Sequence, residues 1–263
     1  MRNKESVFRK RKITYSAVLV SILALYLVSS LITEFKLSEG IMAFPEAMTW
    51  ITSTLVPDAK AFERVPKIWN KLMETALLSV AVTTIAAVMA FIFSLFGSRT
   101  LKFHRLINQI VRTVAAFFRN VPDVVWAMLL MFSFGQNILT GFFALFFTTF
   151  GLLTRSFIET IDEVSSDCVE ALDATGADFA QIVFQGIIPS SITGIITWIL
   201  YMIETNIRSS TLIGILTATG IGYLFDMYYK RLEFGSASLV VLSIVVLVII
   251  IETISNQLRK VIT

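Results

Sequence analysis

The sequence contains one cysteine, Cys168, and one histidine, His104, in 263 residues. A single cysteine excludes a disulfide framework and any cysteine-rich metal site. A single histidine makes a zinc centre or a Ser-His-Asp triad hard to assemble. We therefore expect no metal ion, no cofactor and no catalytic group within this chain.

Charge is also scarce: 16% of residues are charged and 56% are hydrophobic, against roughly 25% and 45–50% in a soluble domain. The mean hydropathy is +0.77. The apolar residues gather in blocks, and about 20 of them in a helix cross roughly 30 Å of hydrocarbon. The composition predicts an all-α fold, a polytopic membrane helix bundle. The small net charge, without a basic stripe and interleaved aromatics, argues against a nucleic-acid partner.

A signal-peptide cleavage site is missing as well. The basic stretch Met1–Lys12 precedes an apolar run over 13–32, which is longer than a typical h-region and ends without small residues in an A-x-A-like pattern. We interpret this run as a retained signal anchor.

About six transmembrane helices fit the hydropathy. The third is preceded by a helix that ends near Phe118, and Pro122 breaks the chain between the two. A second apolar piece, 212–224, is expected to continue the fifth. The expected spans are 13–32, 72–96, 121–134, 138–158, 187–203 and 238–254.

Two regions follow from these spans. Residues 1–71 form an N-terminal cytoplasmic tail, the first span and an external segment, in which 41–55 with Trp50 has the pattern of an amphipathic or interfacial helix. Residues 72–263 form a core of five spans and a cytoplasmic loop at about 159–189.

Orientation is predicted from lysines and arginines near the membrane, which favour the cytoplasmic side. The N-terminus and C-terminus are both expected inside, together with the loop 98–106. The outer loops also carry basic residues, so the dense N-terminal cluster decides the orientation. That cluster is Arg2, Lys4, Arg9, Lys10, Arg11 and Lys12, the inner loop adds Arg99, Lys102 and Arg105, and the C-terminus adds Arg259 and Lys260.

The segment 159–186 is polar and separates two of the predicted apolar spans. It carries seven acidic residues and no lysine or arginine, and its apolar positions recur at helical spacing. Gly176 lies in the middle, so we expect two short helices joined at a glycine hinge outside the lipid. One interpretation is a loop whose charges keep it solvated, and the other is an element on which a partner protein docks.

The residues of this loop resemble the EAA loop of ABC-transporter type I importer permeases, whose pattern is Glu-Ala-Ala, a following glycine, an isoleucine and a final Leu-Pro. Glu170, Ala171, Gly176 and Pro189 match at the right spacing. Leu172 stands in place of the second alanine, and Gly186 in place of the isoleucine. Ile188 replaces the leucine.

Two further stretches are similar to permeases of the phosphonate group. Residues 119–127, which begin Arg-Asn-Val-Pro-Asp and end Val-Trp-Ala, look like the opening of one span in that group. Residues 204–214, followed by Gly220-Ile221-Gly222, look like the segment after its fifth span. The resemblance covers about residue 72 to the C-terminus.

The resemblance implies a half-pore that translocates a small anion, phosphonate first of all, across the cytoplasmic membrane of a prokaryote. It implies a second permease chain, two cytosolic ATPase subunits and an external substrate-binding lipoprotein. The chain has no Gly-x-x-x-x-Gly-Lys-Ser/Thr phosphate loop, so we expect ATP and Mg to be bound by the ATPase partner and this chain to be no enzyme. Other cargoes remain open: phosphite, phosphate or an amino acid. An ion-coupled secondary transporter is the alternative class, although no internal repeat supports it.

The matched loop residues have expected physical roles. Glu170 is expected to pair with a basic residue of the ATPase groove, and Ala171 to pack closely against it. Gly176 permits a backbone bend that a side chain forbids. Pro189 is expected to break the second short helix from the ascending span.

Four charged residues near the spans are candidates for the translocation pathway. Glu204 and Arg208 lie four apart at the expected end of the fifth span and can pair on one helix face. Arg208 has the geometry to bind an oxyanion; the alternative is a structural pair that steadies the end of the span. Arg119 and Asp123 either line the cytoplasmic exit or extend to the interface.

Overall fold

The computed structural model describes residues 2–101 and 104–262, and over these residues it is helical with no strand. Lys102, one of the predicted inner-loop cations, lies outside them. The chain divides into two compact units, Met1–Thr54 and Leu55–Thr263. Residue 72, at which the sequence places the start of the core, lies inside a long helix of the second unit.

The first unit consists of α1 (Arg2–Thr33) and α2 (Leu37–Thr54). Within α1, Lys10–Thr33 is long and apolar enough to cross a membrane, which confirms the first predicted helix. The α2 helix covers most of the stretch predicted as amphipathic, and none of its residues is buried within the chain.

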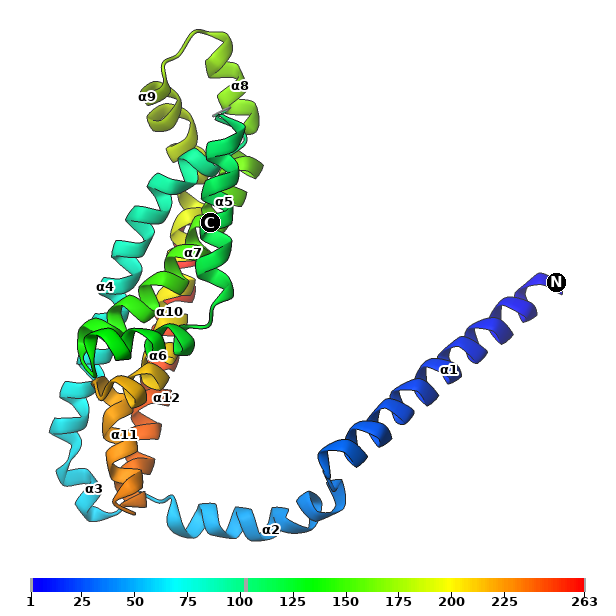
Figure 1. The fold of residues 1–263 in the computed structure, drawn as a ribbon, viewed down its shortest axis with the longest axis vertical. Helices are drawn as coiled ribbons and strands as arrows, with labels where there is room; N and C mark the ends of the chain where they lie inside the picture. Colours follow the sequence, from blue (N-terminus) through cyan, green and yellow to red (C-terminus); the bar gives the residue numbers. More distant parts are fainter. Residues whose placement is uncertain (1, 102–103, 263) are drawn as a thin grey trace. The chain divides into compact units, whose positions relative to one another are not determined.

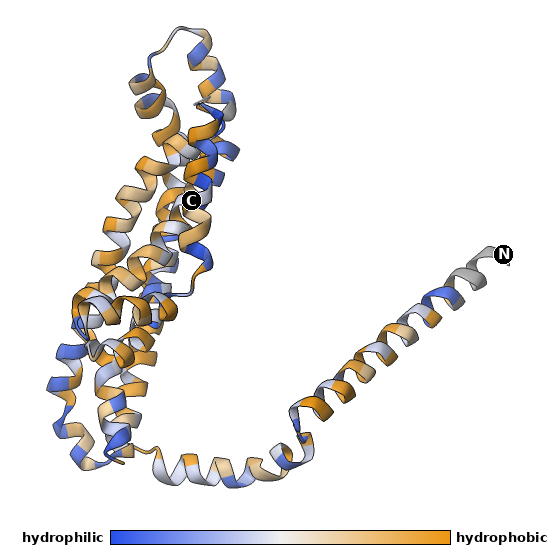
Figure 2. Cartoon of the chain, viewed as in Figure 1, coloured by the Kyte–Doolittle hydropathy of each residue, from blue (hydrophilic) through white to orange (hydrophobic). Residues whose placement is uncertain are grey.

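Four long helices run through the second unit, with shorter helices between them (Figure 1). They are α4 (Val65–Gly97), α7 (Ile138–Val164), α10 (Ile188–Thr217) and α12 (Phe234–Ile262). The short α3 (Ala59–Glu63) precedes α4. Small side chains such as Ala86 and Ala90 are fully buried against Phe157 and its neighbours, which lets α4, α7 and α10 approach closely. Figure 2 shows apolar residues along most of these helices and hydrophilic ones toward the start of α4.

The third predicted span is a broken pair. Helices α5 (Arg105–Asn120) and α6 (Asp123–Phe134) meet at 88°. Pro122 lies between them, so the predicted break is confirmed. The 12 residues of α6 reach only about 18 Å, so they cannot cross the bilayer alone as 121–134 was predicted to do. Among the described residues five helices are long and apolar enough to span, and six if this pair counts as one, which confirms the predicted number.

The acidic segment folds as two helical pieces around Gly176, as predicted: α8 (Ser166–Ala174) and α9 (Phe179–Gln181). Its start was predicted wrongly, because α7 continues to Val164 and takes up the first acidic residues, among them Glu159.

Pro189 does not break the chain as predicted. A π-helical turn, η1 (Ile182–Ile187), joins α9 directly to α10, and Pro189 is the second residue of α10. In the wide turn the Ile188 N–H bonds to the Val183 carbonyl, five residues back. This shift of one residue relieves the clash that a proline creates with the carbonyl four residues earlier.

The fifth helix also differs from the prediction at its far end. The expected continuation 212–224 is split, because α10 ends at Thr217 and α11 (Gly220–Lys230) is a separate helix. Ala218 and Gly220 both have positive φ at the turn. A Cβ on Gly222 would lie 1.9 Å from the Thr211 carbonyl oxygen, so only glycine allows α11 to fold back this closely on α10.

Candidate functional sites: the coupling loop and the membrane charges

The loop that carries the matched residues is anchored by a cluster of its own. From α8, Val169 is buried and Leu172 is partly buried. They pack against the end of α7 and against η1. The buried residues of this cluster are Ile161, Val169, Ile182, Val183 and Ile187, and Leu95 and Leu101 flank them. Burial of this apolar surface holds the loop to the ends of α4 and α7.

The opposite side of α8 is exposed. Glu170 and Ala171 lie there, next in sequence to the buried Val169, and Ala174 and Gly176 are exposed as well. Phe179 and Phe184 add large apolar surface, 47% and 70% exposed. Pro189 is also exposed but lies on α10, beyond the π-turn. Three of the four predicted coupling residues therefore come together on the α8–Gly176 segment, and the fourth does not.

The hinge at Gly176 has a defined geometry. Its φ is +82°, a conformation that costs most residues about 1–2 kcal/mol. The Gly176 N–H bonds to the Asp173 carbonyl at 3.0 Å, and the Ala177 N–H to the Leu172 carbonyl at 3.2 Å. Asp178 then starts α9 with a reciprocal capping box to Gln181. The loop is thus an ordered helix–turn–helix.

Two of the three departures from the EAA pattern, Leu172 and Gly186, lie against one another. A Cβ on Gly186 would lie 2.9 Å from Leu172 Cδ1, closer than side chains tolerate. Leucine in place of the second alanine therefore fills the space that an isoleucine at position 186 would need. The sequence presented these as two separate mismatches, and the structure shows that they compensate.

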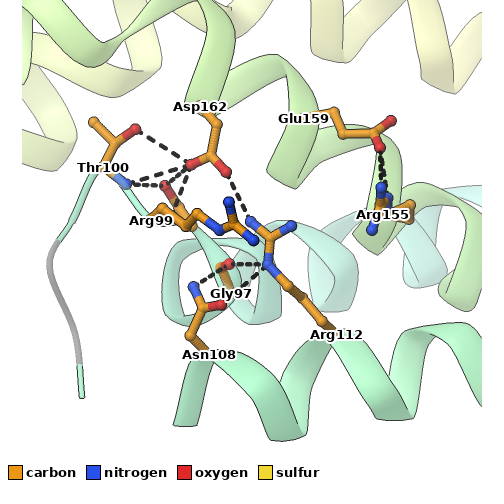
Figure 3. A network of polar contacts seen from close by, with 9 residues as sticks. Gly97, Arg99, Thr100, Asn108, Arg112, Arg155, Glu159 and Asp162 are labelled. Atoms are coloured by element: carbon orange, nitrogen blue, oxygen red, sulfur yellow. Dashed lines mark hydrogen bonds and ion pairs between the residues drawn. The ribbon is translucent and has the colours of Figure 1, made fainter. Parts of the chain in front are cut away.

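Asp162 joins three helices at the same end of the bundle (Figure 3). Its carboxylate pairs with Arg112 Nη2 of α5 at 2.7 Å, and accepts hydrogen bonds from Ser98 Oγ at 2.5 Å and the Arg99 N–H at 2.8 Å. The Arg112 Nε donates to the Gly97 carbonyl at 3.0 Å. Sequence reasoning counted Asp162 as a loop acid, and no sequence signal pointed to a partner 50 residues away.

The pathway candidates lie in two places. Glu204 and Arg208 form the predicted i,i+4 ion pair, at 2.9 Å, but inside α10 rather than at its end. Arg119 is exposed at the last turn of α5, and Asp123 starts α6, where its Oδ1 accepts from the Val124 N–H at 2.9 Å. Glu204 and Arg208 therefore pair on one helix, whereas Arg119 and Asp123 lie on either side of the break between α5 and α6.

Sequence reasoning missed two polar features of the spans. Asn206 is 3% exposed and its Nδ2 donates to the hydroxyls of Thr83 and Thr149, both at 2.9 Å, so one amide joins α10 to α4 and α7. Arg155 pairs with Glu159 on α7 at 2.5 Å. The i,i+4 spacing of Arg155 and Glu159 matches that of Glu204 and Arg208 and was the signal that could have found it.

Among the described residues, the long apolar helices and the exposed helical loop at one end of the bundle define the class as a polytopic, all-helical membrane protein. Residues 83–263 match the family described as binding-protein-dependent transport system inner membrane component. The match covers more than half of the chain, so the protein belongs to that family and is the permease subunit of an ABC importer.

Curated relatives agree with this class, and solved structures share the fold. The chain is 28% identical over 251 residues to a putative phosphite transport system permease protein of Stutzerimonas stutzeri, covering 95% of this chain and 87% of that one. It is 26% identical over 189 residues to a phosphate-import permease protein of Mycolicibacterium smegmatis, covering 72% of this chain and 36% of that longer protein. The crystal structure of an amino acid ABC transporter has the same fold, with a TM-score of 0.66 at 16% identity over 78% of this chain and 98% of its own.

Proposed function

We propose that this permease carries a small phosphorus oxyanion, namely phosphite, a phosphonate or phosphate, into the cell. The observation that carries the proposal is the similarity over 95% of the chain to a permease named for phosphite transport. A guanidinium in the middle of α10, 52% exposed on Arg208, supports an anionic cargo, because guanidinium matches the oxygens of a tetrahedral oxyanion in bidentate fashion.

We also propose that the α8–Gly176 segment receives the motion of a cytosolic ATPase. Glu170, Ala171 and Gly176 present an exposed surface on a loop that is itself packed onto α4 and α7, so force on the loop reaches the spans. Pro189 sets the junction with α10 in this scheme. Two ATPase subunits hold ATP and Mg, a second permease chain completes the pore, and an external binding protein delivers the cargo.

The proposed pathway includes Arg208, balanced by Glu204, and passes Arg119 and Asp123 at the break between α5 and α6. Neutralising Arg208 by Arg208→Gln is expected to lower uptake while ATP hydrolysis continues.

The test is uptake of radiolabelled phosphite, methylphosphonate and phosphate into liposomes that hold the permease, its ATPase and its binding protein. ATP-dependent uptake of at least one of the three supports the proposal. Uptake of an amino acid and of none of the three anions would refute it. A Glu170→Lys variant checks the coupling: we expect uptake to fall at least about tenfold, because the reversed charge opposes a basic groove.

A further inference from the structure

Each of the helices α7 and α10 carries a single basic residue, Arg155 and Arg208 respectively. Each arginine pairs with a glutamate four residues away, Arg155 with Glu159 at 2.5 Å and Arg208 with Glu204 at 2.9 Å. The arginine side chains are 43% and 52% exposed. Ionised groups within the bilayer avoid lipid and face water-filled cavities or protein, so these two pairs mark surfaces of the helices that lipid does not cover.

Both arginines turn away from the packed side of their helices. Asn206 and Thr149, which bond to each other at 2.9 Å, mark that side on α10 and α7. At 100° per residue, Arg208 lies about 200° around α10 from Asn206, and Arg155 about 120° around α7 from Thr149.

The two helices are antiparallel, and their register fixes the heights of the arginines. Thr149 is level with Asn206, to which it is hydrogen-bonded. Eleven residues later on α7, Thr160 is level with Gly194, because a Cβ added to Gly194 would lie 2.7 Å from Thr160 Cγ2. By a rise of 1.5 Å per residue, Arg155 lies about 12 Å closer than Arg208 to the end that carries α8.

The charges follow the same order along the bundle in both pairs. On α7 the arginine precedes the glutamate, and on α10 the glutamate precedes the arginine. Because the helices are antiparallel, each arginine lies on the side away from α8 and each glutamate on the side toward it. Helix stability does not account for this, since a glutamate preceding its cationic partner is the more favourable order and α7 has the reverse.

We propose that Arg208 and Arg155 are two successive binding positions for the transported oxyanion, Arg208 first and Arg155 second. The inference rests on the proposed function, because it takes a phosphorus oxyanion as the cargo. Each guanidinium binds two oxygens of the anion, and its glutamate balances the charge when the position is empty. The glutamate also repels the bound anion, so that each position holds it weakly enough to release it.

The decisive experiment exchanges the two charges of one pair. Arg155→Glu combined with Glu159→Arg keeps the ion pair and its spacing but reverses its direction along the pathway. In liposomes with the ATPase and binding protein, we expect phosphite uptake to fall at least about tenfold, while ATP hydrolysis stimulated by the binding protein stays within about twofold. The exchange Glu204→Arg with Arg208→Glu is expected to do the same.

The matched control is the i,i+4 pair Asp226–Lys230 of α11, joined at 2.7 Å. Asp226→Lys with Lys230→Asp is expected to leave uptake unchanged. Normal uptake by the Arg155–Glu159 exchange would show that the pair is only structural and would overturn the inference. If wild type carries none of the three anions, it is the proposed function that fails instead.

A milder variant keeps the test decisive if the exchanged protein does not fold. Arg155→Lys retains the charge but removes the planar bidentate group, so we expect a KM for phosphite uptake raised at least about threefold with ATP hydrolysis unchanged. A KM equal to that of wild type in Arg155→Lys would also overturn the inference.

Discussion

Asp162 shows how one carboxylate can hold together the end of the bundle that carries α8. It accepts from Ser98, from the Arg99 N–H and from Arg112, and these groups come from the end of α4 and from α5. Asp162 and Arg112 are 25% and 19% exposed. Removal of one member of such a pair leaves the other charge partly desolvated and unpaired.

We therefore expect Asp162→Asn to lower the free energy of unfolding by about 2 kcal/mol, less than for a fully buried pair because water still reaches both groups. Thermal unfolding in detergent measures the change. The neighbouring Glu163 is exposed, and Glu163→Gln is the control, with an expected effect below about 0.5 kcal/mol. Equal melting temperatures for the two variants would contradict this account of Asp162.

At the scale of elements, the contact between α8 and η1 depends on the large side chain of Leu172 and on the lack of a side chain at Gly186. Leu172 Cδ1 would lie 2.9 Å from a Cβ at position 186. Gly186→Ile forces the two segments apart and is expected to cost about 1–3 kcal/mol. Leu172→Ala leaves a cavity in the cluster and is expected to cost about 2 kcal/mol.

The double variant, Leu172→Ala with Gly186→Ile, is expected to be more stable than the Gly186→Ile single variant, because the isoleucine fills the space that the leucine leaves. Unfolding of the four proteins gives the coupling free energy, with an expected size of about 1–2 kcal/mol in favour of the double variant. Strictly additive effects would show that the two positions do not share this space.

The elements also show which features a sequence reveals. The end of α4 at Gly97, the break at Pro122 and the hinge at Gly176 were predictable, because glycine and proline act on the local backbone. The continuous helix through Pro189 was not predictable from the sequence, because no residue type indicates the π-helical turn that accommodates this proline. The partners of Asp162 and Asn206 lie 50 or more residues away, so only the packed helices reveal them.

At the scale of the whole second unit, the end opposite α8 is closed by a contact between distant parts of the chain. Arg64, just before α4, forms an ion pair with Glu233, just before α12, and its guanidinium lies 4.6 Å from the centre of the Tyr228 ring. Ser238 Oγ donates to the Leu55 carbonyl nearby at 2.6 Å. The hydrogen bond from Arg64 holds the pKa of Glu233 below its usual value, helped by the charges of Arg231 and Lys60.

A lowered pKa in the folded state means that Glu233 stabilises the fold above its unfolded pKa of about 4.3 and loses this contribution as the pH falls through the folded value. We expect wild type to melt at a higher temperature than Glu233→Gln near pH 7, with the gap closing below about pH 4. Glu63→Gln, at an exposed neighbouring position, is expected to show no such pH-dependent gap. A gap for Glu233→Gln that persists in acid would refute the assignment.

The packing of the second unit defines two ends, and its basic residues alone do not say which faces the cytosol. Arg99 and Arg105 lie at the end with α8, whereas Lys60 and Arg64 lie at the other. Under the positive-inside rule this near balance leaves the decision to the basic residues in the first turns of α1. If the first span starts inside, as the sequence predicts, we expect α3 outside and the end of the second unit that carries α8 inside.

Cys168 allows a direct test of this orientation, since it is the chain's one cysteine and is exposed on α8. In cells that express the permease without its ATPase, a membrane-impermeant maleimide is expected to leave Cys168 unlabelled, and to label it in inverted vesicles. The matched probe is Phe62→Cys in a Cys168→Ser background, because Phe62 of α3 is 59% exposed; it is expected to react in intact cells. Labelling of Cys168 from outside would reverse the topology and place the α8–Gly176 segment beyond the reach of a cytosolic ATPase.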